Sequence, residues 1–167
     1  VCKSKYIKHF GIGTEKVEEE VKRLFPSARV ARMDSDNIRK KEDYDNILGS
    51  MKKNEIDILI GTQMISKGLD FPNVTLVGII AADTTLNLPD FRSAEKTFQL
   101  TTQVAGRAGR GDVAGSVYLQ TYNPEHFSIQ YAKDNNYEAF FNEELKLRRE
   151  FGYPPFLNLI VITIFGP

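Results

Sequence analysis

Through residue 121, hydrophobic and polar positions follow a pattern that predicts strands and helices in alternation. Strands are marked by short, nearly continuous apolar runs, at residues 6–10, 29–33, 57–61, 74–81 and 116–121. Helices are marked by apolar residues three or four positions apart, at residues 14–25, 44–51 and 93–108. The runs at 57–61 and 74–81 are typical of parallel strands buried on both faces. The alternation predicts an α/β fold in which helices flank a mainly parallel sheet.

Beyond Tyr122 the pattern changes to a helical tail. Two amphipathic stretches, residues 125–134 and 137–150, are followed by an apolar, β-branched run at 157–165 that predicts one further strand. We expect the tail to connect the sheet domain to another domain of a longer protein. Its larger apolar side chains could bind a partner protein, or they could pack on the sheet domain or on the next domain. These side chains are Phe140, Phe141, Leu145 and Phe151.

Composition narrows the classes of protein that this chain can be. Its 167 residues are 41% hydrophobic and 26% charged, which is ordinary for one globular domain with its own core. The formal net charge is zero, and any binding of nucleic acid must therefore come from a local groove. No apolar run reaches the roughly 20 residues that span a bilayer, and a single cysteine excludes an internal disulfide framework. We expect a cytoplasmic protein without a membrane partner.

Candidate chemistry follows the predicted strand at 57–61, because ligands of parallel α/β sheets bind beyond the carboxyl ends of the strands. Thr62 offers a hydroxyl group and a nearby backbone N–H that suit a nucleic-acid phosphate. Asp70 offers a carboxylate that could bind a ribose hydroxyl or orient an arginine. Both residue types are also common at junctions, where Thr62 could cap the next helix and Asp70 could begin a turn before Pro72.

A second candidate site lies at residues 103–111 (QVAGRAGRG), at the expected end of the helix at 93–108. Arg107 and Arg110 are three positions apart, which places both guanidinium groups on one face of a helix. Gly106 and Gly109 leave that face without bulk, and a planar, permanently charged guanidinium suits a polyphosphate. The alternative is a solvated helix C-terminus, where glycine and arginine are both common.

The chain lacks the other parts of a nucleotide site. It contains no G-x-x-x-x-G-K-[ST] sequence to hold β- and γ-phosphates, and no acid pair suited to magnesium follows a strand. Gly11-Ile12-Gly13 is a weak anion-binding signal that is better explained as a loop into a helix with Thr14 as its N-cap. The two arginines therefore resemble half of a nucleotide site.

Four segments resemble a known family. Residues 61–72 (GTQMISKGLDFP) are similar to motif V of superfamily 2 helicases, and residues 103–110 (QVAGRAGR) to their motif VI. Residues 82–100 (ADTTLNLPDFRSAEKTFQL) and 13–26 (GTEKVEEEVKRLFP) narrow the resemblance to the bacterial primosomal replication-restart helicases. The resemblance covers essentially the whole chain. One departure is that an acidic position expected near Ala81 is apolar here, although Asp83 remains.

The resemblance implies the second, C-terminal RecA-like lobe of an ATP-dependent 3′-to-5′ DNA helicase that acts in replication restart and primosome assembly. Arg110 matches the arginine finger and Arg107 the companion arginine at the γ-phosphate. The positions implied to lie near the nucleotide are Gln103, Gly68 and Asp70. The positions implied to contact single-stranded DNA are Thr62, Gln63 and Lys67.

The same resemblance implies cofactors, partners and a division of the chain. ATP with Mg²⁺ would be shared with the first lobe, and this chain alone would be inactive. Partners would be single-stranded and forked DNA, the first lobe, primosome proteins and single-strand-binding protein. Cys2 resembles the last cysteine of a zinc-binding insertion, and Zn²⁺ would bind only in the full-length protein. The implied parts are the edge of that insertion (1–10), the RecA-like lobe (11–123), a helical connector (124–156) and the start of a truncated C-terminal domain (157–167).

Two other functions stay open on sequence grounds. A non-catalytic docking lobe would bind primosome partners through its tail helices. An RNA-directed helicase lobe of the same superfamily would share motifs V and VI, but the LPDFRSAEKTFQL block argues against it.

Overall fold

The computed structural model describes residues 13–34, 36–38, 40–62, 65, 71, 73–106, 108 and 114–164. Within these residues the elements are α1 (Thr14–Leu24), β1 (Val30–Met33), α2 (Lys41–Lys52), β2 (Ile58–Gly61), β3 (Leu76–Ile79), α3 (Asp83–Leu86), α4 (Ser93–Ala105), β4 (Ser116–Leu119), α5 (Phe127–Lys133) and α6 (Tyr137–Glu150). The α/β prediction and the alternation of strands with helices are confirmed, and the chain has the RecA-like arrangement of parallel strands flanked by helices.

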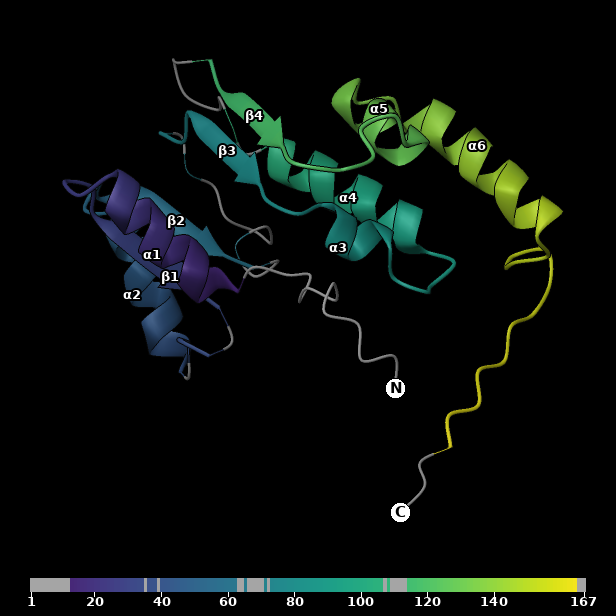
Figure 1. Ribbon diagram of the computed structural model, residues 1–167, viewed down its shortest axis with the longest axis horizontal. Coiled ribbons are helices and arrows are strands. Elements are labelled where there is room, and N and C mark those ends of the chain that lie inside the picture. Colours follow the sequence, from purple (N-terminus) through teal and green to yellow (C-terminus); the bar gives the residue numbers. More distant parts are fainter. Residues whose placement is uncertain are drawn as a thin grey trace, which may run out of the picture.

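The strands form two parallel pairs. β1 pairs with β2, in a register that places Val30 opposite Ile58, and β3 pairs with β4, with Leu76 opposite Ser116. Figure 1 shows β1 and β2 together with α1 and α2, while β3 and β4 lie side by side near α3 and α4. Because each pair is parallel, the carboxyl ends of its two strands lie at one edge, where the sequence places the candidate residues. The strand predicted at 6–10 lies outside the described residues.

Burial of β3 differs from the prediction. Its side chains alternate between exposed and half-buried, and Leu76 is 63% exposed. Such alternation belongs to a strand that is covered on one face, and α4 contacts β3 on the covered side. In β2 only Ile60 is buried. The expectation that both strands are buried on both faces is therefore wrong for the described part of the chain, because a continuous apolar run does not reveal how many faces a neighbour covers.

Helix ends depart from the prediction at two places. Gly13, rather than Thr14, occupies the N-cap of α1, and the Thr14 hydroxyl instead donates a hydrogen bond to Asp34. Helix α4 ends at Ala105 rather than near 108, because Gly106 takes the C-cap and donates its N–H to the carbonyl of Thr102. Residues 103–111, which contain Arg107 and Arg110 and are called the arginine segment below, therefore begin in the last turn of α4 and continue past its end.

The tail helices pack on α4. Phe98 of α4, Ala132 of α5 and Phe140 of α6 form a buried cluster, with Phe127 and Tyr131 packed against it. Phe140 thus packs on the lobe itself, as one of the sequence alternatives expected. Phe141 and Phe151 remain largely exposed and Leu145 is half-buried.

The chain beyond α6 adds no regular element. Residues 157–164 form no strand in the structure, and their side chains are mostly exposed. In Figure 1 this segment is the yellow coil that leads away from α6. Among the described helices none is long and apolar enough to cross a membrane.

Candidate nucleotide and nucleic-acid site

Two of the predicted site residues, Thr62 and Gln103, lie in the described part of the chain. Thr62 follows β2 directly, and its side chain is exposed. Gln103 lies in the last turn of α4 and is exposed as well. In the described part of the chain no hydrogen bond joins these two side chains. The other predicted residues lie outside the described residues, namely Arg107, Arg110, Gln63, Lys67, Gly68, Asp70 and Cys2.

Gly61 fixes the approach of β2 to β1 at this edge. A Cβ atom added to Gly61 would collide with the carbonyl oxygen of Met33 and would lie 2.9 Å from Cγ2 of Ile65. Met33 is fully buried, and its carbonyl belongs to the backbone of β1, which cannot move aside at low cost. The absence of a side chain at Gly61 therefore lets the two strands close together and sets the place of Thr62 after it.

Replacing Gly61 with alanine is expected to destabilise the lobe by about 1–3 kcal/mol, because the new methyl group forces β1 and β2 apart. Urea unfolding followed by circular dichroism measures this change. Gly78 in β3 is the matched control, because no atom lies within 4 Å of a Cβ built there. An equal loss of stability in the two variants would show that steric closure at Gly61 is not the cause.

Asp34, directly after β1, is a structural anchor. Its Oδ1 accepts hydrogen bonds from the backbone N–H groups of Asp36 (3.0 Å) and Asn37 (2.9 Å). Its Oδ2 accepts from the Thr14 hydroxyl and from Nη1 of Arg32 at 3.1 Å. The Thr14 hydroxyl and then the backbone N–H groups lower the pKa of this carboxyl below its usual value, against the effect of burial. Asp34 therefore ties α1 to the end of β1 and is saturated by partners within the protein.

Asp83 performs the same task at the other pair of strands. Its carboxylate is buried at the start of α3 and accepts from the Thr121 hydroxyl at 3.0 Å and from the N–H of Tyr122 at 3.1 Å. Ala81, just before α3, has a φ of 56°, in the left-handed region that costs a residue with a Cβ about 1–2 kcal/mol. The Thr84 hydroxyl, which donates to the Ala81 carbonyl at 2.6 Å, helps to hold this turn. Asp83, which the sequence analysis left without a role, therefore anchors the chain just after β4.

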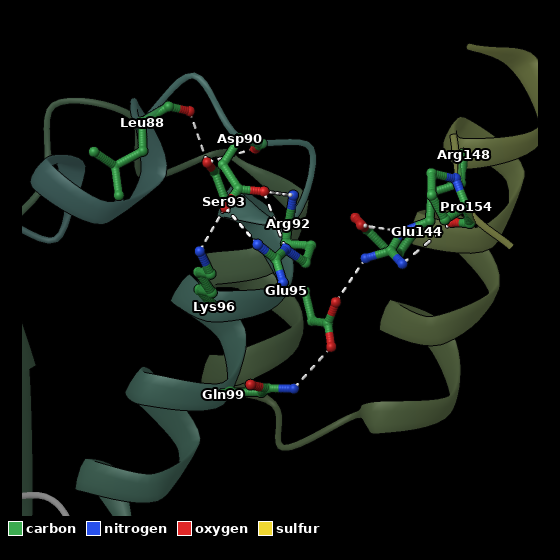
Figure 2. A network of polar contacts seen from close by, with 10 residues as sticks. All are labelled: Leu88, Asp90, Arg92, Ser93, Glu95, Lys96, Gln99, Glu144, Arg148 and Pro154. Atoms are coloured by element: carbon green, nitrogen blue, oxygen red, sulfur yellow. Dashed lines mark hydrogen bonds and ion pairs between the residues drawn. The ribbon is translucent and has the colours of Figure 1, made fainter. Parts of the chain in front are cut away.

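Residues 82–100, which carry part of the family resemblance, contain a polar cluster around the start of α4. The sequence did not predict this cluster. Asp90 accepts hydrogen bonds from Arg92 (3.2 Å) and Lys96 (2.6 Å), and the Ser93 hydroxyl donates to the carbonyl of Leu88 at 2.7 Å (Figure 2). The Arg92 and Lys96 donors hold the pKa of Asp90 well below its usual range. This cluster fixes the start of α4, the helix that carries Gln103.

A second polar cluster links α4 to α6. Arg148 of α6 binds Glu144 on its own helix and Glu95 on α4 (Figure 2). The four-residue spacing of Glu144 and Arg148 is a signal that sequence reasoning could have used. The contact with Glu95 spans 53 positions along the chain and has no local signal. Among the described residues no cluster of three or more His, Cys, Asp or Glu could hold a metal ion.

Known proteins share much of this sequence. The family model described as "Helicase conserved C-terminal domain" matches residues 4–112. The chain is 55% identical over 163 residues to replication restart protein PriA of Bacillus subtilis, which covers 98% of the chain and 20% of that protein. PriA of Synechocystis is 48% identical over 99% of the chain, and PriA of Borreliella burgdorferi is 47% identical over 98% of it. The chain spans 20% and 24% of these two relatives.

Proposed function

Because the chain belongs to the family of helicase conserved C-terminal domains, we propose that it is the second motor lobe of an ATP-dependent 3′-to-5′ DNA helicase that acts in replication restart. In this proposal Arg110 is the arginine finger, Arg107 contacts the γ-phosphate, and Gln103, Gly68 and Asp70 lie near the nucleotide. The phosphate cradle, the Mg²⁺ ligands and the first lobe belong to the rest of the full-length protein. Cys2 stays a predicted ligand of a zinc-binding insertion.

The observation that carries this proposal is the contrast between two kinds of polar residue at the ends of strands and helices. Asp34 and Asp83 are buried and bound to neighbours within the lobe. Thr62, directly after β2, and Gln103, in the last turn of α4, have exposed side chains that make no hydrogen bond with any described residue. Exposed polar groups at the end of a strand and at the end of a helix are suited to bind a ligand.

The chemistry follows from the residue types. Two guanidinium groups next to a transferring phosphoryl group stabilise the negative charge that spreads over its oxygens. The sequence supports half of such a site, because the arginines follow α4 while the chain contains no phosphate-cradle motif. The hydroxyl of Thr62 is neutral and suits a backbone phosphate, which fits a chain of zero net charge. Single-stranded or forked DNA is the proposed partner here, and primosome proteins and single-strand-binding protein are proposed partners of the full-length protein.

The nucleic-acid part is tested by replacing Thr62 with alanine in the full-length protein. We expect weaker binding of single-stranded DNA and weaker stimulation of ATP hydrolysis, by about 10- to 150-fold for one lost hydrogen bond to a charged phosphate. Since threonine carries no charge, the affinity should fall equally at each salt concentration and the slope of log K against log [salt] should not change. Fluorescence anisotropy with a labelled oligonucleotide measures both quantities.

Thr75 is the matched control, because it lies at the amino end of a strand, β3, rather than at a carboxyl end, and is also exposed. Its replacement by alanine should leave DNA binding unchanged. Unaltered binding by the Thr62→Ala variant at several salt concentrations would remove Thr62 from the interface. Stimulation by an RNA strand equal to that by DNA would instead favour the RNA-directed alternative.

A further inference from the structure

The guanidinium group of Arg148 joins three segments of the chain. Its Nη2 donates a hydrogen bond to Glu95 Oε2 of α4 at 2.6 Å, and its Nε donates to Glu144 Oε1 of α6 at 2.9 Å. Its Nη1 donates to the carbonyl oxygen of Pro154, beyond α6, at 3.4 Å. Figure 2 shows the guanidinium group in the space between α6 and α4, facing Glu95. Helix α6, helix α4 and the segment that follows α6 therefore meet at this one group.

The link is partly shielded from water, more on the Arg148 side than on the Glu95 side. The side chain of Arg148 is 16% exposed, and that of Glu95 is 34% exposed. Burial opposes the charge of Arg148, but the hydrogen bonds to Glu95 and Glu144 outweigh it and raise the pKa of Arg148 above its usual value. The guanidinium also lies 5.0 Å from the centre of the Phe91 ring, which stacks on Tyr153 at 5.3 Å. The group therefore stays charged, and each contact depends on the position of the others.

The end of α6 turns the chain back toward Arg148. Gly152 has a φ of 67°, and the N–H of Tyr153 donates to the carbonyl of Arg148 at 2.7 Å, while the N–H of Gly152 donates to that of Arg149 at 3.4 Å. These two bonds make the glycine-based helix ending in which the chain reverses over the last turn. The reversal brings Tyr153 and Pro154 to the side of α6 where Arg148 lies. Residues 151–154 are thus held against the same ion pair that holds α4.

On the other side, α4 extends from this link to Gln103. Glu95 lies in its first turn, and the helix runs without a break to Ala105, past Gln103, where the arginine segment begins. Its 13 residues form a rod of about 20 Å at 1.5 Å per residue. Phe98 stacks on Phe140 of α6 at 4.1 Å, which gives the two helices a second point of contact. A shift of α6 relative to α4 would therefore be carried along α4 toward Gln103 and the residues that follow.

We propose that Arg148 is a positioning residue that couples the segment after α6 to the arginine segment through Glu95 and α4. This inference rests on the proposed function. The bond to Pro154 is the longest of the three, and it is the first to break when the segment at 151–154 moves. The guanidinium group then changes its hydrogen bond to Glu95, and the position of α4 changes with it. A domain attached after α6 can in this way adjust the alignment of the arginine segment on the nucleotide.

The test uses Glu95→Gln and Arg148→Gln in the full-length protein, alone and together. We expect each single variant to lower kcat of DNA-stimulated ATP hydrolysis by about 10- to 100-fold, the size of effect that a misplacement of about 1 Å produces. KM for ATP should change less than kcat, because alignment rather than contact is lost. The double variant should lose no more than either single variant, since both remove the same link. Additive losses would overturn the coupling.

Arg23→Gln is the matched control. Arg23 also pairs with a glutamate, but its partner Glu20 lies on the same helix, α1. This variant should keep the kcat of the unaltered protein, and an equal loss would show that the effect is not specific to the link with α6. If the Arg148→Gln variant does not fold, the Glu95→Gln variant alone tests the coupling, because it leaves the Arg148–Glu144 pair in place.

A readout without ATP separates this inference from the proposed function. Amide hydrogen exchange in the Glu95→Gln variant should become faster along α4 as far as residues 101–105, while the midpoint of thermal unfolding changes little. A purely local role for the ion pair would affect only the first turn of α4, near Glu95, and that result would overturn the inference even in an active enzyme. Failure of the proposed function would instead be seen as an unaltered full-length protein without DNA-stimulated ATPase activity.

Discussion

Replacing Arg110 with alanine in the full-length protein is expected to remove nearly all DNA-stimulated ATP hydrolysis. An arginine finger stabilises the charge of the phosphoryl group only in the transition state, and its loss typically costs about 10³- to 10⁵-fold in rate. Alanine offers neither charge nor hydrogen bonds. Steady-state ATPase assays at saturating ATP and DNA measure the loss as a fall in kcat. Binding of single-stranded DNA should remain, because its proposed contacts come from other residues.

The control for Arg110 is Arg23→Ala, which removes an exposed arginine of the same chain whose partner, Glu20, lies on the same helix, α1. Its ATPase rate should match that of the unaltered protein. The chain by itself supplies a background measurement, because it lacks a phosphate cradle and should show no turnover even with DNA. An Arg110→Ala variant within about threefold of the unaltered rate would be far outside the range for a finger and would assign its role to another residue.

The sequence predicted the elements well where the signal is local. Helix α6 has the bounds that its amphipathic pattern gives, and β1, β2 and β4 lie within the predicted apolar runs. The same reasoning placed Thr62 after a strand and Gln103 near the end of a helix, as the structure has them, because strand ends and helix ends can be read from adjacent residues. Their roles in binding stay predictions. It failed for the coverage of β3, which depends on which helix packs on each face of the strand.

Long-range polar contacts explain the remaining differences. Thr14 has the residue type of an N-cap, but its hydroxyl binds Asp34, 20 positions away, and Gly13 takes the cap. Asp83 and Thr121 are likewise brought together only by the pairing of β3 with β4. Each of these residues has an ordinary local explanation that would have satisfied its hydrogen bonds equally well. Pattern and propensity cannot choose between a local partner and a distant one, because the distant partner exists only in the folded chain.

Replacing Phe140 with alanine is expected to have the largest effect on stability. Its side chain is 3% exposed, and its ring stacks on Phe98 at 4.1 Å and on Phe127 at 5.7 Å. Removing such a ring leaves a cavity between α4, α5 and α6 and costs about 3–5 kcal/mol. For a domain of this size each kcal/mol lowers Tm by about 2–4 °C, which predicts a fall of about 6–20 °C. Differential scanning calorimetry measures it directly.

Phe141, the next residue of the same helix, is the matched control. It is 47% exposed, and alanine gives the same gain in helix propensity at both positions, so that the difference between the variants reports packing alone. We expect Phe141→Ala to cost at most about 1.5 kcal/mol, half of what a fully buried phenylalanine contributes. Equal losses at the two positions would mean that α6 does not pack on α4 through Phe140. The helical tail would then be a separate connector, and Arg148 would have no fixed partner in Glu95.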